Sequence, residues 1–384
     1  MLSCSLGVDP RAARISVSAV FLIHGIGMAN WLTRIPSMQA KLGLSVGILG
    51  LALLGMAAGC FVSMPLVSKL VSRYGSARAT RWTSLAFCAA LTLPALATSA
   101  ASLGVLLFVF GLTAGAMDVA MNTQAVDVET AYRRPVMVSF HALFSLGGMI
   151  GSGMGGLAAA ARIDPLIHLA AAGLLLAIAV LFATRRLLAD LPGAVLERSR
   201  ARVVLTPLLG LAVIAFCVLV GEGAMADWTA VYLSHLTGPG TAAAGYAAFS
   251  LAMAGGRFAG DKLRGRVGSV ALVRWGGLIA AVGLGAGLLS GGVTGALIGF
   301  ACAGAGFSTI FPIACSAAGR KAGVNAQAGI AAVTAFGYLG FVTGPPVIGF
   351  LAQMSSLRLA LGFVVVLSAT AALLAGGARS ADQA

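Results

Sequence analysis

Long apolar runs, each close to 20 residues and almost free of charge, recur along the whole 384-residue chain. A helix of that length crosses a hydrocarbon core of about 30 Å. Backbone groups in lipid must find their hydrogen bonds within the chain, so helices are the expected structure. The pattern predicts twelve membrane-spanning helices, at residues 15–34, 46–68, 80–97, 102–124, 136–160, 165–184, 206–228, 243–260, 271–290, 293–316, 327–352 and 357–377.

The composition agrees with this pattern. Hydrophobic residues make up 59% of the chain and charged residues only 9%, whereas a soluble domain carries about 25% charged residues. The expected fold class is therefore an all-α integral membrane protein. The six cysteines show no C-x-x-C spacing, so the sequence predicts neither a metal site nor a disulfide, and no cofactor is expected.

The net charge of +14 would suit a nucleic-acid partner, but the placement of the cations argues against one. Nearly all Lys and Arg residues fall in alternate connections between the apolar runs. The other connections hold only four: Arg34, Lys41, Arg162 and Arg358. By the positive-inside rule the basic connections, and both termini with them, are expected on the cytoplasmic side of a lipid bilayer.

One fifteen-residue segment occurs twice. Residues 68–82 and 261–275 are identical at 7 of 15 positions when they are aligned without a gap. A shorter echo pairs residues 28–31 with residues 225–228, and the tryptophan of each copy is expected near the outer membrane interface. The two offsets, 193 and 197, indicate a duplicated half of roughly 190 residues, a pattern typical of membrane transporters.

The duplication predicts two pseudo-symmetric bundles of six helices each. Residues 1–184 are expected to form the first bundle and residues 206–384 the second. The segment 185–205 is the only long polar stretch between apolar runs, and it is interpreted as a cytoplasmic linker.

The repeated loop resembles the signature loop of the major facilitator superfamily. The better copy reads Gly256-Arg257-Phe258-Ala259-Gly260-Asp261-Lys262-Leu263, followed by Arg266 and Gly268. The run from Gly115 to Asn122, with Glu129 and Phe140-His141 after it, is similar to the fucose-permease-like branch and its bacterial relatives. The resemblance implies the major facilitator fold, a bacterial inner (cytoplasmic) membrane and a monomer.

The resemblance also implies a conformational latch at the cytoplasmic ends of the helices. Ser68 stands where the acid of the first copy would align, so the latch is expected to depend on the second copy. The alternative is that the basic residues only set the topology. The residues assigned to the latch are Asp261, Arg257, Arg266 and Gly268 in the second half, with Arg73 and Gly75 in the first.

An ionisable group inside a membrane span costs roughly 2.5–3.5 kcal/mol, so each one is a candidate functional residue. Span four carries Asp118 and Asn122 on one helical face, and Asp118 matches the functional acid that the fucose-permease resemblance implies there. Span five carries His141. Counted from a loop at 125–134, Asp118 and His141 each lie about 9 Å deep, so we expect them at one level. They are interpreted as a proton-coupling or substrate site, the alternative being a polar pair that ties two helices together.

Five more residues are candidates for proton coupling or substrate contact: Glu222, His24, Tyr338, Asn30 and Asp227. Glu222 lies deep enough in span seven to face a cavity. Asn30 and Asp227 are pseudo-symmetric partners near the outer rim, where ordinary interfacial residues are the favoured interpretation. For His24 a packed neutral histidine is an equal alternative.

These features predict a secondary active transporter that moves a small neutral or weakly polar solute, such as a sugar, by alternating access with proton coupling. No Lys or Arg is expected at mid-membrane, which argues against a strongly anionic solute. The alternatives are proton-driven efflux of lipophilic compounds and, in another class, a non-transporting membrane sensor or structural protein. Enzyme activity is not expected: the nucleophile-elbow pattern at residues 43–47 opens an apolar helix with no strand before it.

Overall fold

The computed structural model describes residues 8–189, 206–321 and 323–382, and within those ranges all regular secondary structure is helical. This confirms the all-α fold class. The chain divides into two compact units, one of residues 1–44 and 52–196 and the other of residues 45–51 and 197–384. Most of the predicted linker, residues 190–205, lies outside the described residues.

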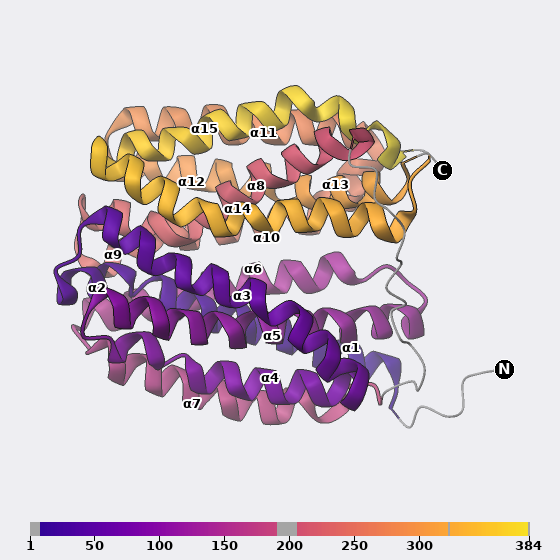
Figure 1. Cartoon of the computed structure of the whole chain (residues 1–384), viewed down its shortest axis with the longest axis horizontal. Coiled ribbons are helices and arrows are strands. Elements are labelled where there is room, and N and C mark those ends of the chain that lie inside the picture. The colour runs from indigo at the N-terminus through magenta and orange to yellow at the C-terminus, as the bar shows by residue number, and fades with distance from the viewer. Residues whose placement is uncertain (1–7, 190–205, 322, 383–384) are drawn as a thin grey trace. The chain divides into compact units, whose positions relative to one another are not determined.

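The first unit contains seven α-helices and two short 3-10 helices in its described residues, with α3 belonging to it from Ala52 onward (Figure 1). They are α1 (Pro10–Leu32), α2 (Ile35–Leu42), α3 (Val46–Tyr74), α4 (Ser76–Ala90), η1 (Leu93–Leu96), α5 (Ala100–Tyr132), α6 (Met137–Ala160), α7 (Pro165–Ala183) and η2 (Thr184–Arg186).

The second unit repeats this series with more breaks. Its described helices are η3 (Thr206–Leu208), α8 (Leu209–Ser234), α9 (Pro239–Ala242), α10 (Ala244–Val267), α11 (Ser269–Ser290), α12 (Val293–Phe307), α13 (Ile310–Gly319), α14 (Ala326–Met354), α15 (Leu357–Leu373) and η4 (Leu374–Asp382). The consecutive helices α12 and α13 together cover the predicted span at 293–316.

Every predicted span is helical, and in the described part of the chain ten helices are long and apolar enough to cross a membrane. The remaining two predicted spans, 80–97 and 243–260, correspond to α4 with η1 and to α10. Helix α4 has only 15 residues, and the last third of α10 is rich in basic residues. Both helices that fall short of the criterion, α4 and α10, lie beside the repeated basic loop. The charges of that loop lower the mean hydropathy of the helices that flank it.

Several helices continue beyond the hydrophobic run that predicts them. Helices α3, α5 and α10 end at Tyr74, Tyr132 and Val267, whereas the apolar runs end at 68, 124 and 260. Lys, Arg and Glu are good helix formers, so a polar continuation does not end the helix. This extension changes the depth at which several candidate residues lie.

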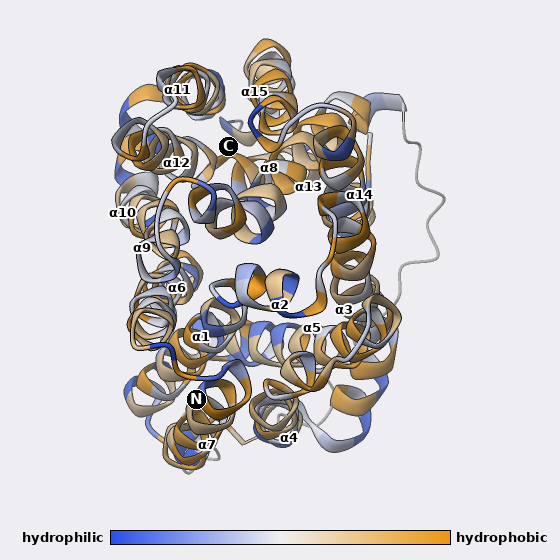
Figure 2. Cartoon of the chain, turned by 90° about the vertical axis from the view of Figure 1, so that its left-hand side faces the viewer, coloured by the Kyte–Doolittle hydropathy of each residue, from blue (hydrophilic) through white to orange (hydrophobic). Residues whose placement is uncertain are grey.

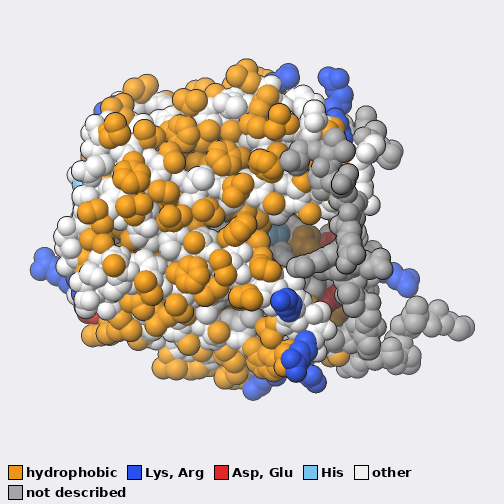
Figure 3. Space-filling model, in the orientation of Figure 1, with side chains coloured by type: hydrophobic (Ala, Val, Ile, Leu, Met, Phe, Trp, Pro, Cys, Tyr) orange, Lys and Arg blue, Asp and Glu red, His pale blue; other side chains and the backbone are white. Residues whose placement is uncertain are grey.

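The surface is apolar, as a lipid-facing surface requires. On the face that Figure 3 shows, hydrophobic side chains predominate and Lys and Arg side chains lie mostly near its margins. Leu157, Leu174, Leu289 and Leu373 are 65–84% exposed, and Figure 2 shows the same apolar character along the helices seen nearly end-on. Water would penalise so much exposed hydrocarbon, whereas lipid does not. Of the repeated tryptophans, Trp31 is the next-to-last residue of α1 and Trp228 lies six residues before the end of α8, and both side chains are fully buried.

Glycine allows close packing of helices inside the first unit. A Cβ atom on Gly111 of α5 would overlap the carbonyl oxygen of Met56 on α3. In the same way, a Cβ atom on Gly151 of α6 would overlap the carbonyl oxygen of Ile26 on α1. Small residues that let two backbones approach are the usual contact of membrane helices.

We expect Gly151→Val to destabilise the first unit by about 1–3 kcal/mol through overpacking against α1. Gly153, two residues along α6, has no atom within 4 Å of a Cβ placed there. Gly153→Val is therefore a matched control with the same loss of helix propensity. Thermal unfolding of the detergent-purified variants measures the difference, and equal melting temperatures for the two variants would contradict this packing.

Candidate transport site and cytoplasmic turns

An ion pair occupies the middle of the second unit. Arg257 Nη2 of α10 lies 3.8 Å from Glu222 Oε2 of α8, and the two side chains are 13% and 15% exposed. Glu222 is 13 residues from the start of α8, and Arg257 is 13 residues from the start of α10. Neither residue is near a helix end, so the charges lie along the two helices and not at their termini.

Further polar groups surround this pair. Tyr246 on α10 is 7% exposed, hydrogen-bonds with Ser250, and lies within electrostatic range of Glu222, Arg257 and Asp227. Asp227 is 8% exposed and lies five residues after Glu222 on α8. These five residues comprise two acids, one base and two hydroxyl groups carried by α8 and α10, and we call them the α8–α10 cluster.

The position of Arg257 corrects one expectation. The sequence places it at a helix end, among the residues of a cytoplasmic latch. Because α10 continues to Val267, Arg257 is ten residues, or about 15 Å, from that end of the helix. It pairs with Glu222, which the sequence treats as a separate candidate.

Asp118 and Asn122 lie together on α5, as predicted. The Asn122 side-chain amide donates to Asp118 Oδ1 at 3.1 Å and to the Asp118 carbonyl oxygen at 2.9 Å. Asp118 is the nineteenth residue of the 33-residue helix, so this carboxylate also lies near mid-helix. Each unit therefore has a carboxylate near the middle of a helix, Asp118 in α5 and Glu222 in α8.

The prediction that Asp118 and His141 lie at one level is wrong. Helix α5 continues to Tyr132 and α6 begins at Met137, so the two residues are 14 and 4 residues from the connecting loop. At about 1.5 Å per residue, their depths differ by about 15 Å. His141 instead meets the ring edge of Phe21 on α1, with centroids 5.2 Å apart.

Glu129 explains the short connection between α5 and α6. Its Oε2 atom accepts hydrogen bonds of 2.8 Å from the backbone N–H groups of Val136 and Met137. These groups are the orphan donors at the start of α6. Glu129 therefore caps the start of α6, and its role is to stabilise the loop between α5 and α6.

His24 is packed among aromatic rings. It is 4% exposed, and its ring lies 5.0 Å from that of Phe87 and 5.3 Å from that of Phe144. Among the described residues, neither ring nitrogen has a hydrogen-bond partner. A charged imidazole would be costly in this apolar setting, so the structure favours the packed neutral histidine over a cavity residue.

Asn30 belongs to a buried network that includes a residue the sequence analysis missed, His168 of α7. Arg34 Nε donates to His168 Nδ1 at 3.0 Å, and His168 Nε2 lies 2.8 Å from Asn30 Oδ1. Because Arg34 Nε carries a hydrogen, His168 Nδ1 accepts and Nε2 donates, which defines a neutral imidazole. All three side chains are at most 8% exposed.

This network ties α1 to α7, and it has no equivalent among the described residues of the second unit. Arg34 Nη2 also donates to the carbonyl oxygen of Ile163 at 2.9 Å. The repeat partner of Asn30 is Asp227, and the partner of Arg34 at the same offset of 197 is Val231. A structural amide in the first unit therefore corresponds to a carboxylate of the α8–α10 cluster in the second. No hydropathy pattern signals His168, because it pairs with residues more than 130 positions away.

The repeated Gly-Ser turn has one backbone conformation in both units. Gly75 has φ 84° and ψ 162°, and Gly268 has φ 79° and ψ 165°. Residues with a side chain rarely adopt this region, which accounts for glycine in both copies. The duplication inferred from the sequence therefore extends to the backbone dihedrals.

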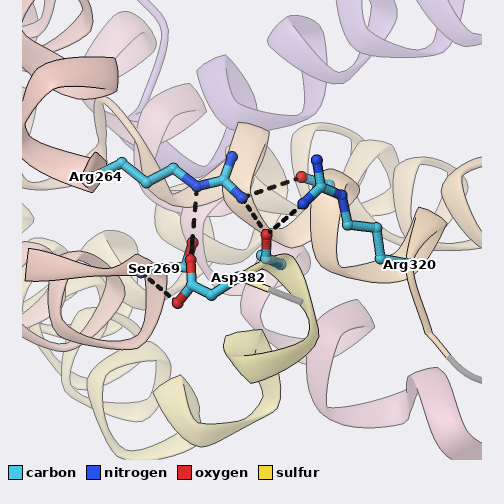
Figure 4. Close-up of polar contacts among 6 residues, drawn as sticks. Arg264, Ser269, Arg320 and Asp382 are labelled. Carbon is cyan, nitrogen blue, oxygen red and sulfur yellow. Dashed lines mark hydrogen bonds and ion pairs between the residues drawn. The ribbon is translucent and has the colours of Figure 1, made fainter. Parts of the chain in front are cut away.

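Two basic residues of the predicted latch, Arg73 and Arg266, lie on the surface. Arg73 stacks over the ring of Tyr74 at 5.2 Å, and Arg266 is exposed. The side chain of Asp261 lies outside the described residues. In the second unit the polar contacts at this turn instead join Arg264, Ser269, Arg320 and Asp382 (Figure 4).

The spans, the duplicated turn and the buried charges define a multi-pass membrane transporter. The chain belongs to the Major Facilitator Superfamily, whose family model matches residues 17–328. It is 35% identical over 367 residues to an uncharacterised MFS-type transporter of Yersinia pestis, with 94% of each chain covered. It is also 30% identical to the membrane protein MosC of Rhizobium meliloti, covering 92% of this chain and 87% of that one.

Solved structures share the fold at low sequence identity. A bacterial homologue of the human lysosomal transporter Spinster aligns with a TM-score of 0.74 at 14% identity, over 97% of this chain and 98% of the other. The fucose:proton symporter FucP of E. coli aligns with a TM-score of 0.64 at 16% identity, over 96% and 98%. The nucleoside transporter NupG aligns with a TM-score of 0.68 at 14% identity, over 97% and 99%.

Proposed function

We propose that this chain is a proton-coupled secondary transporter that moves a small neutral or weakly polar solute, such as a sugar, by alternating access. The observation that carries the proposal is the Glu222–Arg257 pair in the middle of α8 and α10. Coupling is assigned to this pair, and the hydroxyl groups of the α8–α10 cluster are assigned to the solute. A monomer in a bacterial inner membrane, with both termini cytoplasmic, is the form in which we expect it to act.

The physical argument begins with the cost of burying charge. A buried ion pair loses several kcal/mol of hydration per ion, and apolar residues of similar volume are often at least as stable. Stability therefore does not account for Glu222 and Arg257. The separation of 3.8 Å exceeds the 2.7–2.9 Å that is usual for a charge-assisted hydrogen bond. A loosely held pair is the arrangement that protonation of the carboxylate can break.

Protonation of Glu222 would leave the charge of Arg257 unbalanced, and this links proton uptake to a change in the α8–α10 cluster. With Glu222 ionised, the pair has no net charge, which suits a neutral solute. Tyr246 and Ser250 offer hydroxyl groups in the same cluster. Groups of this kind recognise hydroxylated solutes by hydrogen bonding.

A small monocarboxylate is the second candidate solute, and Arg257 is the observation that favours it. An anion that arrives together with a proton on Glu222 would replace the lost partner of Arg257. The same cluster would then couple one proton to one anion. The comparison of neutral and anionic solutes is therefore part of the test.

The test uses purified protein in proteoliposomes that contain a pH-sensitive dye. The external solutes are fucose, a nucleoside and a monocarboxylate, each added without an imposed proton gradient. We expect one class to drive proton uptake into the vesicles with matching uptake of the radiolabelled solute. Solute entry without proton movement would contradict the coupling, and proton movement with the monocarboxylate alone would select the second candidate.

Asp118 provides an independent prediction. We expect Asp118→Asn to shift or flatten the pH dependence of transport, because the amide cannot take up a proton near mid-helix. The variant keeps a side chain of the same shape beside Asn122, so folding is expected to survive. Transport rates measured from pH 5 to pH 8 decide this point. A wild-type pH profile would remove Asp118 from the coupling mechanism.

A further inference from the structure

In each unit a carboxylate holds the serine of the repeated Gly-Ser turn, but the two carboxylates come from different parts of the chain. In the first unit Ser76 Oγ donates to Asp127 Oδ2 of α5 at 2.7 Å. In the second unit Ser269 Oγ donates to Asp382 Oδ1 at 2.6 Å, and the Ser269 backbone N–H donates to Oδ2 at 2.8 Å. Asp382 is the last residue of η4, in the segment that follows the final long helix.

The repeat explains why the second unit needs another source of carboxylate. At the offset of 193 that relates the two turns, the position of Asp127 is taken by Arg320, a residue of opposite charge. Arg320 Nη1 donates to the Ala381 carbonyl oxygen at 3.1 Å (Figure 4). Arg320, which stands at the repeat position of Asp127, thus helps to hold the segment that supplies Asp382.

A second arginine completes this arrangement. Arg264 Nη2 of α10 also donates to the Ala381 carbonyl oxygen, and Arg264 Nε lies 3.8 Å from Asp382 Oδ1. The equivalent of Arg264 in the first unit is Val71, which cannot make either contact. The two arginines and Ser269 therefore bind the end of η4 to α10, α11 and α13.

The rest of η4 is packed, so Asp382 is held in place by its own segment. Ser380 Oγ donates to the Ala317 carbonyl oxygen at 2.9 Å, and Ala378 and Ala381 are fully buried. The charged groups are more open, with the side chains of Arg264 and Asp382 29% and 41% exposed. Partly exposed ion pairs contribute little stability and open readily. The backbone of η4 is therefore held by packing, whereas the ion pair between Arg264 and Asp382 can open.

We propose that Asp382 is a positioning residue of the transport cycle, and that the end of η4 is a clasp on the turn between α10 and α11. The clasp fixes Gly268 and Ser269 in the conformation that the first unit obtains from Asp127. It opens and closes as α10 and α11 move against α13. The proposal rests on transport itself and is independent of the solute and of proton coupling.

The first part of the test needs no solute. A cysteine is placed at Gly265 on the exposed end of α10 or at Ser72, its repeat equivalent on α3, in a chain whose native cysteines are replaced. Removal of residues 381–384 eliminates four hydrogen bonds and the Arg264–Asp382 ion pair. We expect it to raise the maleimide labelling rate of Gly265→Cys by at least about fivefold. Labelling of Ser72→Cys should stay unchanged. Removal of 383–384 alone is the control, since it leaves every described contact of Asp382.

The second part separates positioning from folding. With whichever solute of the proteoliposome panel is transported, Asp382→Asn should lower the maximal exchange rate several-fold and change KM less than twofold. Asp382→Glu should restore most of the rate. The proposal is overturned if the chain ending at Ser380 labels and transports like the full chain, or if Asp382→Glu fails to restore the rate. If no panel solute moves, the proposed function fails, while the labelling rates still decide whether the clasp exists.

Discussion

Glu222→Gln should abolish uphill transport and leave downhill exchange intact. The amide cannot gain or lose a proton, so the α8–α10 cluster loses the group whose protonation is proposed to break the pair with Arg257. Solute accumulation should fall to the equilibrium level, a loss of at least about tenfold, or about 1.4 kcal/mol of coupling. Counterflow, in which labelled and unlabelled solute exchange without a proton gradient, should continue.

Two controls make this result specific. Glu129→Gln carries the same change to a carboxylate that caps α6, where an amide oxygen can still accept from Val136 and Met137, so coupling should stay near the wild-type level. Glu222→Gln combined with Arg257→Gln removes both charges and avoids an uncompensated buried cation. The double variant should fold and exchange without accumulating solute. Accumulation by Glu222→Gln at the wild-type level would remove the pair from the mechanism.

Arg34→Ala should destabilise the first unit by about 3 kcal/mol. The variant leaves His168 Nδ1 and the Ile163 carbonyl oxygen without their buried donor, and each unsatisfied buried group costs about 1–3 kcal/mol. Arg34→Lys should recover only part of the loss, because an ammonium group lacks the fork that reaches both acceptors. Chemical unfolding in detergent, followed by tryptophan fluorescence, measures the change.

The control for this prediction is Arg358→Ala. Arg358 is exposed and donates to the Leu289 carbonyl oxygen, so its loss should cost less than about 1 kcal/mol. Equal stability of the Arg34 and Arg358 variants would contradict the buried network. A loss of transport at unchanged stability would instead make Arg34 a functional residue.

The fold could be predicted from the sequence because its determinants are local or repeated. Runs of apolar residues set the spans, and the alternation of basic connections set the expected orientation. The repeated Gly-Ser pair required a backbone that only glycine adopts easily, and both copies have it. These signals need no knowledge of which helices pack together.

The candidate site was predicted less well, for two physical reasons. Hydropathy marks where apolar composition ends, and α5 and α10 continue as helices beyond that point. The depth of Asp118 was therefore underestimated, and Arg257 was assigned to a helix end. Partners from distant segments also leave no local pattern, so the link between Arg34 and His168 and the role of Asp382 emerge only from the packed structure.

The central claim is that the chain contains two like-oriented halves whose repeated turns face the same side of the membrane. Ser72→Cys and Gly265→Cys occupy equivalent exposed positions beside the two turns, and a membrane-impermeant maleimide reports their side in intact cells and in inside-out vesicles. We expect both cysteines to react in the vesicles and neither to react in intact cells. Labelling of the two positions from opposite sides would contradict the account.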